Sequence, residues 1–331
     1  MIKMLKNGKI SSVTKKTVLL QYCLLYLNIS FMKTKEGIIM KKLLFIINPR
    51  AGLKKNPGFI DEAVEVFEQA GYKVGKKFTK KRADATEIAR DHGNDVDLIV
   101  CMGGDGTLNE VFEGMMEGEV RTPIGYIPAG STNDFANSLG LETKPEEAAK
   151  FIVSHKPRKL DMGEFNGRAF AYTASCGIFT KTSYATSQKL KNKLGHAAYV
   201  LSASKEIFHV KKLKMKVELP NEVIEGNYIF AAINNATKVG GVMKLDENMV
   251  EFNDGLFELM LIEYPKNPVD LAKLVGKVAK QRFTGKITLI QIDQAKITID
   301  SDVDWSLDGE KEKGQSYISF RVIPDAINFI Y

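Results

Sequence analysis

Residues 96–107 read VDLIVCMGGDGT, and this stretch decides the fold. The apolar run that ends at Met102 is typical of a strand buried in a parallel sheet. A glycine-rich loop follows directly, Gly103-Gly104-Asp105-Gly106-Thr107. Apolar residues then recur at helical spacing, at positions 108, 111, 112 and 115. The stretch therefore predicts a strand, a glycine-rich loop and a helix.

The same order of elements continues on both sides of this stretch. The spacing of apolar residues predicts strands at 43–47, 72–79 and 124–127 and helices around 60–67 and 85–91, with Gly71 closing the first helix. Strands that alternate with helices indicate a parallel sheet with right-handed crossovers. We expect an α/β domain with a doubly wound parallel sheet.

The pattern changes after about residue 160. Strand-like runs dominate, interrupted by helical patterns at about 195–208 and 268–280; the runs are 169–175, 212–219, 227–233, 257–262, 287–292 and 296–299. This indicates a mostly antiparallel, β-sandwich-like second domain. We expect a leader at 1–39 and domains at 40–165 and 166–331, with the last segment able to return to the first domain.

Composition and charge exclude several classes of protein. Cys23, Cys101 and Cys176 form no CxxC pair, which favours a reducing compartment and gives no structural zinc site. The net charge is +7, but residues 1–39 hold seven lysines and one acid, so the leader carries six of these charges. The basic character therefore gives no reason to expect nucleic acid as a partner.

The leader has lysines followed by an apolar stretch at 17–27. It has the outline of a signal peptide, but no small-residue cleavage site follows, and it is short for a membrane span. Met40-Lys41-Lys42 stands directly before the first strand. One interpretation is a disordered or mis-started leader upstream of a natural first residue, Met40. The alternative is an amphipathic membrane anchor.

The glycine-rich loop is suited to phosphate. Glycines let the backbone approach phosphate oxygens, and the N–H groups that begin a helix favour anions. Thr107 and Glu110 have the spacing of a capping box. A tight turn without ligand is the alternative. The loop is neither GxGxxG nor a Walker A motif, which argues against Rossmann dehydrogenases and P-loop enzymes.

Four motifs carry a family resemblance, in chain order: NPRAG at 48–52, GGDGTLNEV at 103–111, PAGSTNDFA at 128–136 and LDGE at 307–310. With these motifs, residues 40–331 resemble the bacterial diacylglycerol kinases, soluble lipid kinases whose nucleotide loop is shared with sphingosine kinases and NAD kinases. The resemblance implies an NAD-kinase-like catalytic domain first and a lipid-binding domain second. It also implies Mg²⁺ as cofactor and ATP as phosphate donor.

Carried over position by position, the resemblance implies a nucleotide site. Its residues would be Asn48, Pro49, Arg50, Ala51, Gly52, Thr79, Gly103, Gly104, Asp105, Gly106, Thr107, Leu108, Asn109, Glu110, Ser131, Asn133 and Asp134.

The resemblance also implies three catalytic residues. Glu310 would be the general base that takes the proton of the lipid hydroxyl, with Asp308 beside it, and Asp105 would lie near the phosphates and the catalytic magnesium. Phosphoryl transfer depends mainly on positioning and charge neutralisation, and a base adds typically about 10²–10⁴-fold. A hairpin turn with exposed acids is the alternative for 308–310, since Asp-Gly is a common turn pair.

A structural cation is implied at Glu251, Asp254 and the main-chain carbonyl of Leu256. Oxygen-only ligands suit a hard cation such as Mg²⁺. A plain Asp-Gly turn before the strand at 257–262 is the alternative.

The expected activity is transfer of the γ-phosphate of ATP to a lipid hydroxyl, with diacylglycerol giving phosphatidic acid. Such an enzyme would be cytoplasmic and would reach its lipid at the inner face of the membrane; monomer and homodimer both stay open. Two alternatives remain: an NAD kinase-like enzyme, which shares GGDGT, and a non-catalytic nucleotide- or lipid-binding protein of the same fold.

Overall fold

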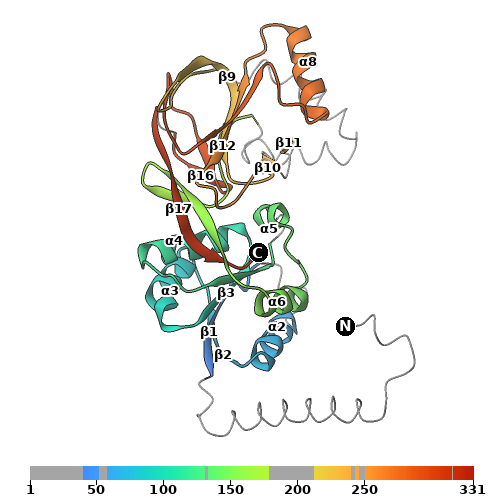
Figure 1. Ribbon diagram of the computed structural model, residues 1–331, viewed down its shortest axis with the longest axis vertical. Coiled ribbons are helices and arrows are strands. Elements are labelled where there is room, and N and C mark those ends of the chain that lie inside the picture. The colour runs from blue at the N-terminus through green and yellow to red at the C-terminus, as the bar shows by residue number, and fades with distance from the viewer. Residues whose placement is uncertain are drawn as a thin grey trace, which may run out of the picture. The chain divides into compact units, whose positions relative to one another are not determined.

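The structure is a computed structural model, and it describes residues 40–51, 58–130, 133–178, 212–239, 243–245, 250–314 and 316–331. Figure 1 shows the chain with its elements labelled. Gly52 and Ser131, both expected in the nucleotide site, lie outside these residues, as does the helix expected at 195–208.

Parallel strands in the order β2-β1-β3-β4 form the first part of the fold. Their bounds are β1 (Lys41–Ile47), β2 (Tyr72–Phe78), β3 (Leu98–Gly103) and β4 (Ile124–Pro128). Leu43 of β1 lies opposite Leu98, and Ile99 of β3 lies opposite Ile124. Strands β3 and β4 are buried along their whole length, which explains their continuous apolar runs.

Helices cover both faces of this sheet. Because side chains alternate along a strand, Phe45 packs with α2 and α6 on one face, and Ile46 packs with α3 and α4 on the other. The helices are α2 (Gly58–Gln69), α3 (Asp84–His92), α4 (Asp105–Glu117), α5 (Asp134–Leu139) and α6 (Pro145–Ser154), with a short 3-10 turn, η3 (Gly93–Asp95). The predicted doubly wound α/β arrangement is confirmed.

The β-rich part packs strands around a second core. Strand β9 changes partners midway: its first half pairs with β8, and its second half lies between β7 and β12. One apolar cluster fills the interior, and another lies under α8 (Pro268–Ala279). The strands are β5 (Arg158–Phe165), β6 (Arg168–Phe170), β7 (Thr173–Gly177), β8 (Leu213–Glu218), β9 (Val223–Asn234), β10 (Lys238–Val239), β11 (Met243–Lys244), β12 (Phe257–Glu263), β13 (Ile287–Ile292), β14 (Gln294–Ile299), β15 (Trp305–Leu307), β16 (Glu310–Glu312) and β17 (Tyr317–Phe329). The predicted β-sandwich-like character is confirmed.

The last strand, β17, joins the two parts (Figure 1). It pairs with β14 at its start and with β5 along most of its length, and its final residue Phe329 lies opposite Ile124 of β4. The pairing with β5 shifts between Ile323 and Ile327, where Asp325 has a positive φ of 54°. A bulge there lets one strand bend from one part of the fold into the other.

The predicted single strand at 169–175 is wrong in one respect. It is two strands, β6 and β7, separated by Ala171 and Tyr172. The N–H groups of these two residues donate to the carboxylate of Asp308, so they are not available to a neighbouring strand.

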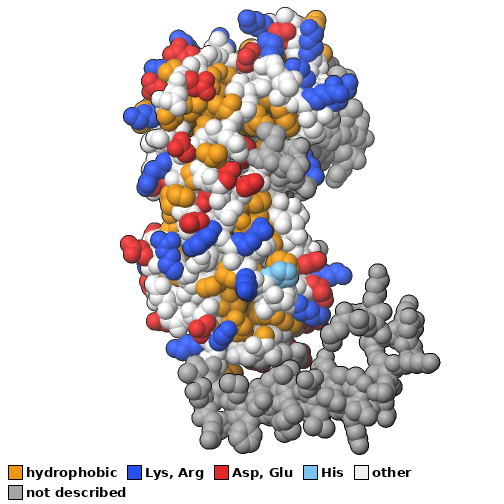
Figure 2. Space-filling model, viewed as in Figure 1, with side chains coloured by type: hydrophobic (Ala, Val, Ile, Leu, Met, Phe, Trp, Pro, Cys, Tyr) orange, Lys and Arg blue, Asp and Glu red, His pale blue; other side chains and the backbone are white. Residues whose placement is uncertain are grey.

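The surface and the helices give two further observations. On the face shown in Figure 2, positive and negative side chains are interspersed and do not gather into one basic patch. Among the described residues, no helix is long and apolar enough to cross a membrane.

Candidate active site

The topology of the parallel sheet places a site at the carboxyl ends of β1 and β3. The chain leaves β1 for β2 on one side and returns to β3 on the other, so the order of strands reverses between β1 and β3. Open α/β sheets bind ligands in the crevice at such a reversal. The NPRAG turn follows β1 and the GGDGT loop follows β3, so both predicted motifs lie at this point.

Side-chain contacts hold these loops together. Asn48 Nδ2 donates to Thr107 Oγ1 at 2.8 Å, which ties the turn after β1 to the helix after β3. Asn48 Oδ1 also accepts from the Arg50 N–H at 3.0 Å, which shapes the turn. Pro49 and Arg50 are exposed beside it. The predicted residues Asn48 to Ala51 therefore form one ordered edge of the site.

The loops after β3 and β4 approach each other so closely that the second loop needs glycine: a Cβ atom built on Gly130 would lie 2.7 Å from the Cα atom of Gly104. Gly103 is needed for a local reason, because a Cβ atom there would lie 2.7 Å from Thr107 Cβ in the helix that follows. Asn133 clamps the second loop, because its Oδ1 accepts from the Gly130 N–H at 2.8 Å. Asn133 thus shapes the loop, with a left-handed φ of 50°.

Asp105 connects two helices at the site. It is the first residue of α4, and its Oδ2 accepts from the Asp134 N–H at 3.1 Å, at the start of α5. Burial, followed by the charges of Asp308, Asp105 and Asp134, raises the pKa of Tyr172. Asp105 therefore ties the start of α5 to the start of α4.

The predicted capping box at Thr107 and Glu110 is wrong. Helix α4 begins two residues before Thr107, and its N-cap is Gly104 without a side-chain cap. The Glu110 carboxylate instead accepts from the N–H groups of Ala83 at 3.0 Å and Ala85 at 3.3 Å. Glu110 therefore holds the loop before α3, and Leu108 and Asn109 are buried behind it in α4.

The loop held by Glu110 carries a cluster of cations. Thr79 donates its N–H to the Ile47 carbonyl, so this loop begins beside the end of β1. Lys80, Lys81 and Arg82 follow and are exposed. Exposed cations beside a glycine-rich helix start suit a ligand with several phosphates.

The LDGE motif forms the turn of a hairpin. Leu307 of β15 lies opposite Glu310 of β16, and the two linking residues both have positive φ, 48° at Asp308 and 84° at Gly309. Two positive φ values are the signature of a tight two-residue hairpin turn. Residues 308–310 do form the hairpin turn that was considered as the alternative. The acids are not exposed as that alternative expected, because Asp308 is buried and Glu310 is half-buried.

Asp308 is 2 % exposed and fully used by the backbone. Its carboxylate accepts from the N–H groups of Ala171, Tyr172 and Thr173 at 2.6, 3.0 and 3.0 Å. Burial raises the pKa of Asp308 to about 6, although the three N–H groups act to lower it. Asp308 therefore fixes the turn from the inside, and the more exposed carboxylate of the motif is that of Glu310, two residues further on.

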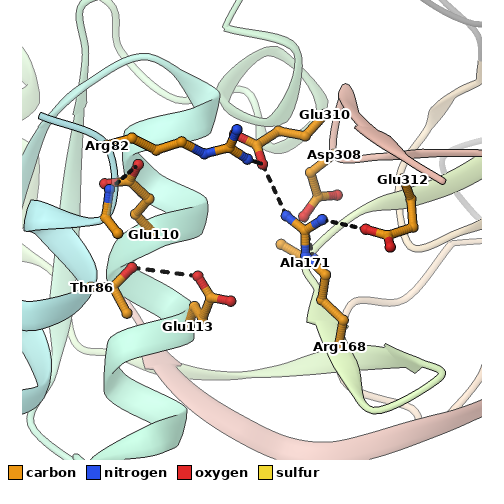
Figure 3. A network of polar contacts seen from close by, with 10 residues as sticks. Arg82, Thr86, Glu110, Glu113, Arg168, Ala171, Asp308, Glu310 and Glu312 are labelled. Atoms are coloured by element: carbon orange, nitrogen blue, oxygen red, sulfur yellow. Dashed lines mark hydrogen bonds and ion pairs between the residues drawn. The ribbon is translucent and has the colours of Figure 1, made fainter.

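Glu310 faces the GGDGT loop from the other part of the fold. Its Oε1 atom lies 3.7 Å from a Cβ atom built on Gly106. Its Oε2 atom contacts Arg82 Nη2 at 2.8 Å and Arg168 Nη2 at 2.9 Å. Figure 3 shows the two guanidinium groups reaching Glu310 from the helical side and from the β-rich side.

The predicted cation residues lie apart from this centre, on the loop before β12. Asp254 is exposed and its Oδ1 accepts from the Leu256 N–H at 2.9 Å; Glu251 is exposed nearby in the chain. Among the described residues, no three His, Cys, Asp or Glu side chains are grouped closely enough to hold a metal ion.

Three residues of the site region have no motif that would reveal them. Arg82 and Arg168 lie outside the four motifs and reach Glu310 only through the fold. Asp161 is 1 % exposed; its oxygens accept from the N–H groups of Gly255 and Asp325, both at 2.7 Å. Asp161 follows Arg158, Lys159 and Leu160 in the sequence, and nothing in this segment predicts that its carboxylate binds two distant N–H groups.

Comparisons with known proteins agree with this architecture. A model of the diacylglycerol kinase catalytic domain matches residues 42–165, and a model of the YegS C-terminal NAD kinase β-sandwich-like domain matches residues 174–331. The chain is 30 % identical over 279 residues to a diacylglycerol kinase of Bacillus subtilis, which covers 82 % of this chain and 90 % of that protein. A diacylglycerol kinase of Staphylococcus epidermidis is 30 % identical over 275 residues, covering 83 % and 86 % of the two chains.

A solved structure shares the same fold. The crystal structure of a candidate diacylglycerol kinase from Bacillus anthracis superposes with a TM-score of 0.73 at 25 % identity, over 88 % of this chain and 97 % of that one. Fold, motifs and matched domains together define a lipid kinase. The chain belongs to the diacylglycerol kinase family.

Proposed function

We propose that this lipid kinase transfers the γ-phosphate of ATP to the hydroxyl of diacylglycerol, giving phosphatidic acid. The observation that carries the proposal is the position of Glu310 over the start of α4, with Oε1 3.7 Å from the Cβ position of Gly106. A nucleotide whose phosphates lie on the α4 N-terminus would present its γ-phosphate to a hydroxyl next to this carboxylate.

The reaction divides between the two sides of the site. Glu310 takes the hydroxyl proton while the lipid oxygen bonds to the γ-phosphorus, and the bond from that phosphorus to the β–γ bridging oxygen breaks to release ADP. Asn48 to Gly52, Thr79, Gly103 to Glu110, Ser131, Asn133 and Asp134 bind ATP or shape its loops. Asp308 holds the turn that presents Glu310.

Magnesium has two proposed places. Asp105 would hold the ion that neutralises the phosphates during transfer. Glu251, Asp254 and the Leu256 carbonyl would hold a structural ion. Both sets offer oxygen ligands, which are the ligands that a hard cation such as Mg²⁺ prefers.

Domain roles and location follow from the same proposal. Residues 40–165 would bind the nucleotide and residues 166–331 the lipid, as a cytoplasmic protein at the inner face of the membrane. In this proposal the lipid is reached at the surface of the bilayer. A homodimer is compatible with this scheme.

A kinase assay with labelled ATP tests the proposal. Purified protein is given diacylglycerol, sphingosine, monoacylglycerol and NAD in separate mixed-micelle reactions. We expect phosphatidic acid to be the major product and Glu310→Gln to lower turnover at least about a hundredfold with ATP binding retained. Phosphate transfer to NAD or sphingosine in preference to diacylglycerol would contradict the proposal.

A further inference from the structure

The carboxylate of Glu310 is held by a forked ion pair from a neighbouring hairpin. Glu310 and Glu312 are two residues apart on β16, so their side chains lie on the same side of the strand. Arg168 of β6 reaches both: its Nη1 contacts Glu312 Oε2 at 2.6 Å and its Nη2 contacts Glu310 Oε2 at 2.9 Å (Figure 3). A planar guanidinium bonded at two points has its orientation fixed.

The backbone behind Arg168 is also fixed. Phe165 of β5 lies opposite Arg168, and the two residues between them have positive φ, 50° at Asn166 and 83° at Gly167, as in a tight hairpin turn. The Asn166 side chain ties this turn to β17: its Nδ2 donates to the Tyr317 carbonyl at 3.1 Å, and its Oδ1 accepts from the Ser319 N–H at 2.7 Å. Arg168 therefore extends from a rigid base.

The two oxygens of Glu310 have different surroundings. Both guanidinium contacts, from Arg82 and from Arg168, are made to Oε2. The other oxygen, Oε1, is the nearest atom to the Cβ position of Gly106, at 3.7 Å, and it takes part in neither of these two contacts. Oε2 is thus an anchor, and Oε1 is the atom directed toward the start of α4.

We propose that Arg168 is the positioning residue for the catalytic base, that Glu312 orients Arg168, and that Oε1 of Glu310 is the oxygen that accepts the substrate proton. Arg168 acts only through Glu310 in this scheme. The proposal rests on the proposed role of Glu310, but it holds for any lipid alcohol that this enzyme phosphorylates.

The contribution expected of Arg168 is one of pre-organisation. Without Arg168, Glu310 keeps only the exposed Arg82 as a partner, so its side chain samples more rotamers, and only some of them direct Oε1 at the hydroxyl. Misplacing a catalytic group by about 1 Å can cost about a hundredfold in rate. We therefore expect Arg168→Ala to lower kcat by about 10- to 100-fold, with KM for ATP and for lipid changed less than about twofold.

A double-mutant cycle separates positioning from a general structural role. The turnover of wild type, Arg168→Ala, Glu310→Gln and the double variant is measured on whichever lipid the wild type phosphorylates best. If Arg168 acts through Glu310, the double variant has the kcat of Glu310→Gln within about twofold. A further tenfold loss in the double variant, or a raised KM for ATP in Arg168→Ala, would overturn the proposal.

Two conservative variants and one control complete the test. Arg168→Lys keeps the charge but loses the fork, so its kcat should lie between wild type and Arg168→Ala, and millimolar guanidinium should partly restore Arg168→Ala. Glu312→Gln should lower kcat by about three- to tenfold. The matched control is Arg321→Ala. It removes a similar pair, with the two oxygens of Glu164 on β5 at 2.8 and 2.7 Å, and this pair does not include Glu310. Its kcat should equal that of wild type.

The outcomes also separate this proposal from the proposed function. An active wild type whose Arg168→Ala variant keeps full kcat overturns the positioning role alone. A folded wild type that phosphorylates no lipid overturns the proposed function, and the role of Arg168 with it.

Discussion

Arg82 and Glu310 form an ion pair of 2.8 Å between residues that are 228 positions apart in the sequence. One lies in the loop before α3 and the other in the β15–β16 hairpin. The pair thus places a cation of the parallel-sheet part against the proposed base of the β-rich part.

The first prediction concerns this pair. The Arg82 side chain is 76 % exposed, so Arg82→Ala should change the free energy of unfolding by less than about 1 kcal/mol. Glu310 keeps its second partner, Arg168, so kcat should fall by only about two- to fivefold. Lys76→Ala is the control, because Lys76 lies on β2, outside this loop, and pairs with Asp61 at 3.8 Å. A larger loss in Arg82→Ala than in Arg168→Ala would make Arg82 the principal anchor.

The second prediction concerns the close contact of two loops. A methyl group at Gly130 would lie 2.7 Å from Gly104 Cα and from Asn133 Oδ1, so Gly130→Ala must push the GGDGT loop away. We expect ATP to bind at least about tenfold more weakly, as measured by calorimetry. Gly276→Ala is the control: no atom lies within 4 Å of its Cβ position in α8, so it should stabilise the fold by about 0.5–1 kcal/mol without affecting ATP. Wild-type ATP affinity in Gly130→Ala would contradict the predicted loop contact.

The third prediction is a pH dependence of stability at Glu258. Burial raises the pKa of this residue, which is 1 % exposed, to about 7. The unfolded chain releases the proton near the ordinary value of 4.5, so folding stability is lost as the pH rises from about 4.5 to about 7. Glu258→Gln does not titrate. It should be more stable than wild type by roughly 2–3 kcal/mol at pH 8 and nearly equal to it at pH 4.

Urea unfolding at the two pH values measures this difference. Glu164→Gln supplies a control of opposite sign, because the hydrogen bond from Arg321 lowers the pKa of Glu164. That variant should be slightly less stable than wild type at pH 8. The two proteins should be equally stable at a pH low enough to protonate Glu164 in both the folded and the unfolded state. A Glu258→Gln gain of the same size at pH 4 and pH 8 would show that the effect is packing and not ionisation.

The fourth prediction tests the proposed structural cation. Without nucleotide, MgCl₂ at about a hundred times its dissociation constant should stabilise the wild type by about 2.7 kcal/mol. Asp254→Asn should lose most of this stabilisation, because one carboxylate ligand is removed. Glu62→Gln, an exposed change on α2, should keep it. Thermal unfolding with and without MgCl₂ reads out the result, and equal stabilisation of all three proteins would exclude Asp254 as a ligand.

The alternation of strands and helices was predictable because each apolar run has the period of its element. The runs at 43–47 and 96–102 became β1 and β3, both central in the sheet. Helix α5 was not predicted: its six residues are too few to show a period, and it is set by contacts of Asp105 with Asp134. Strand β17 was also missed, because Pro324 and the bulge at Asp325 interrupt its alternation.

The candidate site was predictable where a motif lies in one continuous segment. GGDGT and LDGE are such segments, and the structure brings Gly106 and Glu310 together. The partners of Glu310 were not predictable in the same way. An isolated arginine such as Arg168 cannot be told from any surface arginine until the fold brings its side chain to Glu310. The spacing of Thr107 and Glu110 predicted a capping box, but Glu110 instead makes a tertiary contact with Ala83.

The path of β17 has a consequence for separating the two parts of the fold. Phe329 pairs with β4 and packs edge-on against Phe112 of α4. A nucleotide-binding fragment cut at residue 165 lacks these residues, so the β4 edge of its sheet is left uncovered. Exposed strand edges invite pairing with other chains. We therefore expect that fragment to aggregate unless β17 is supplied with it.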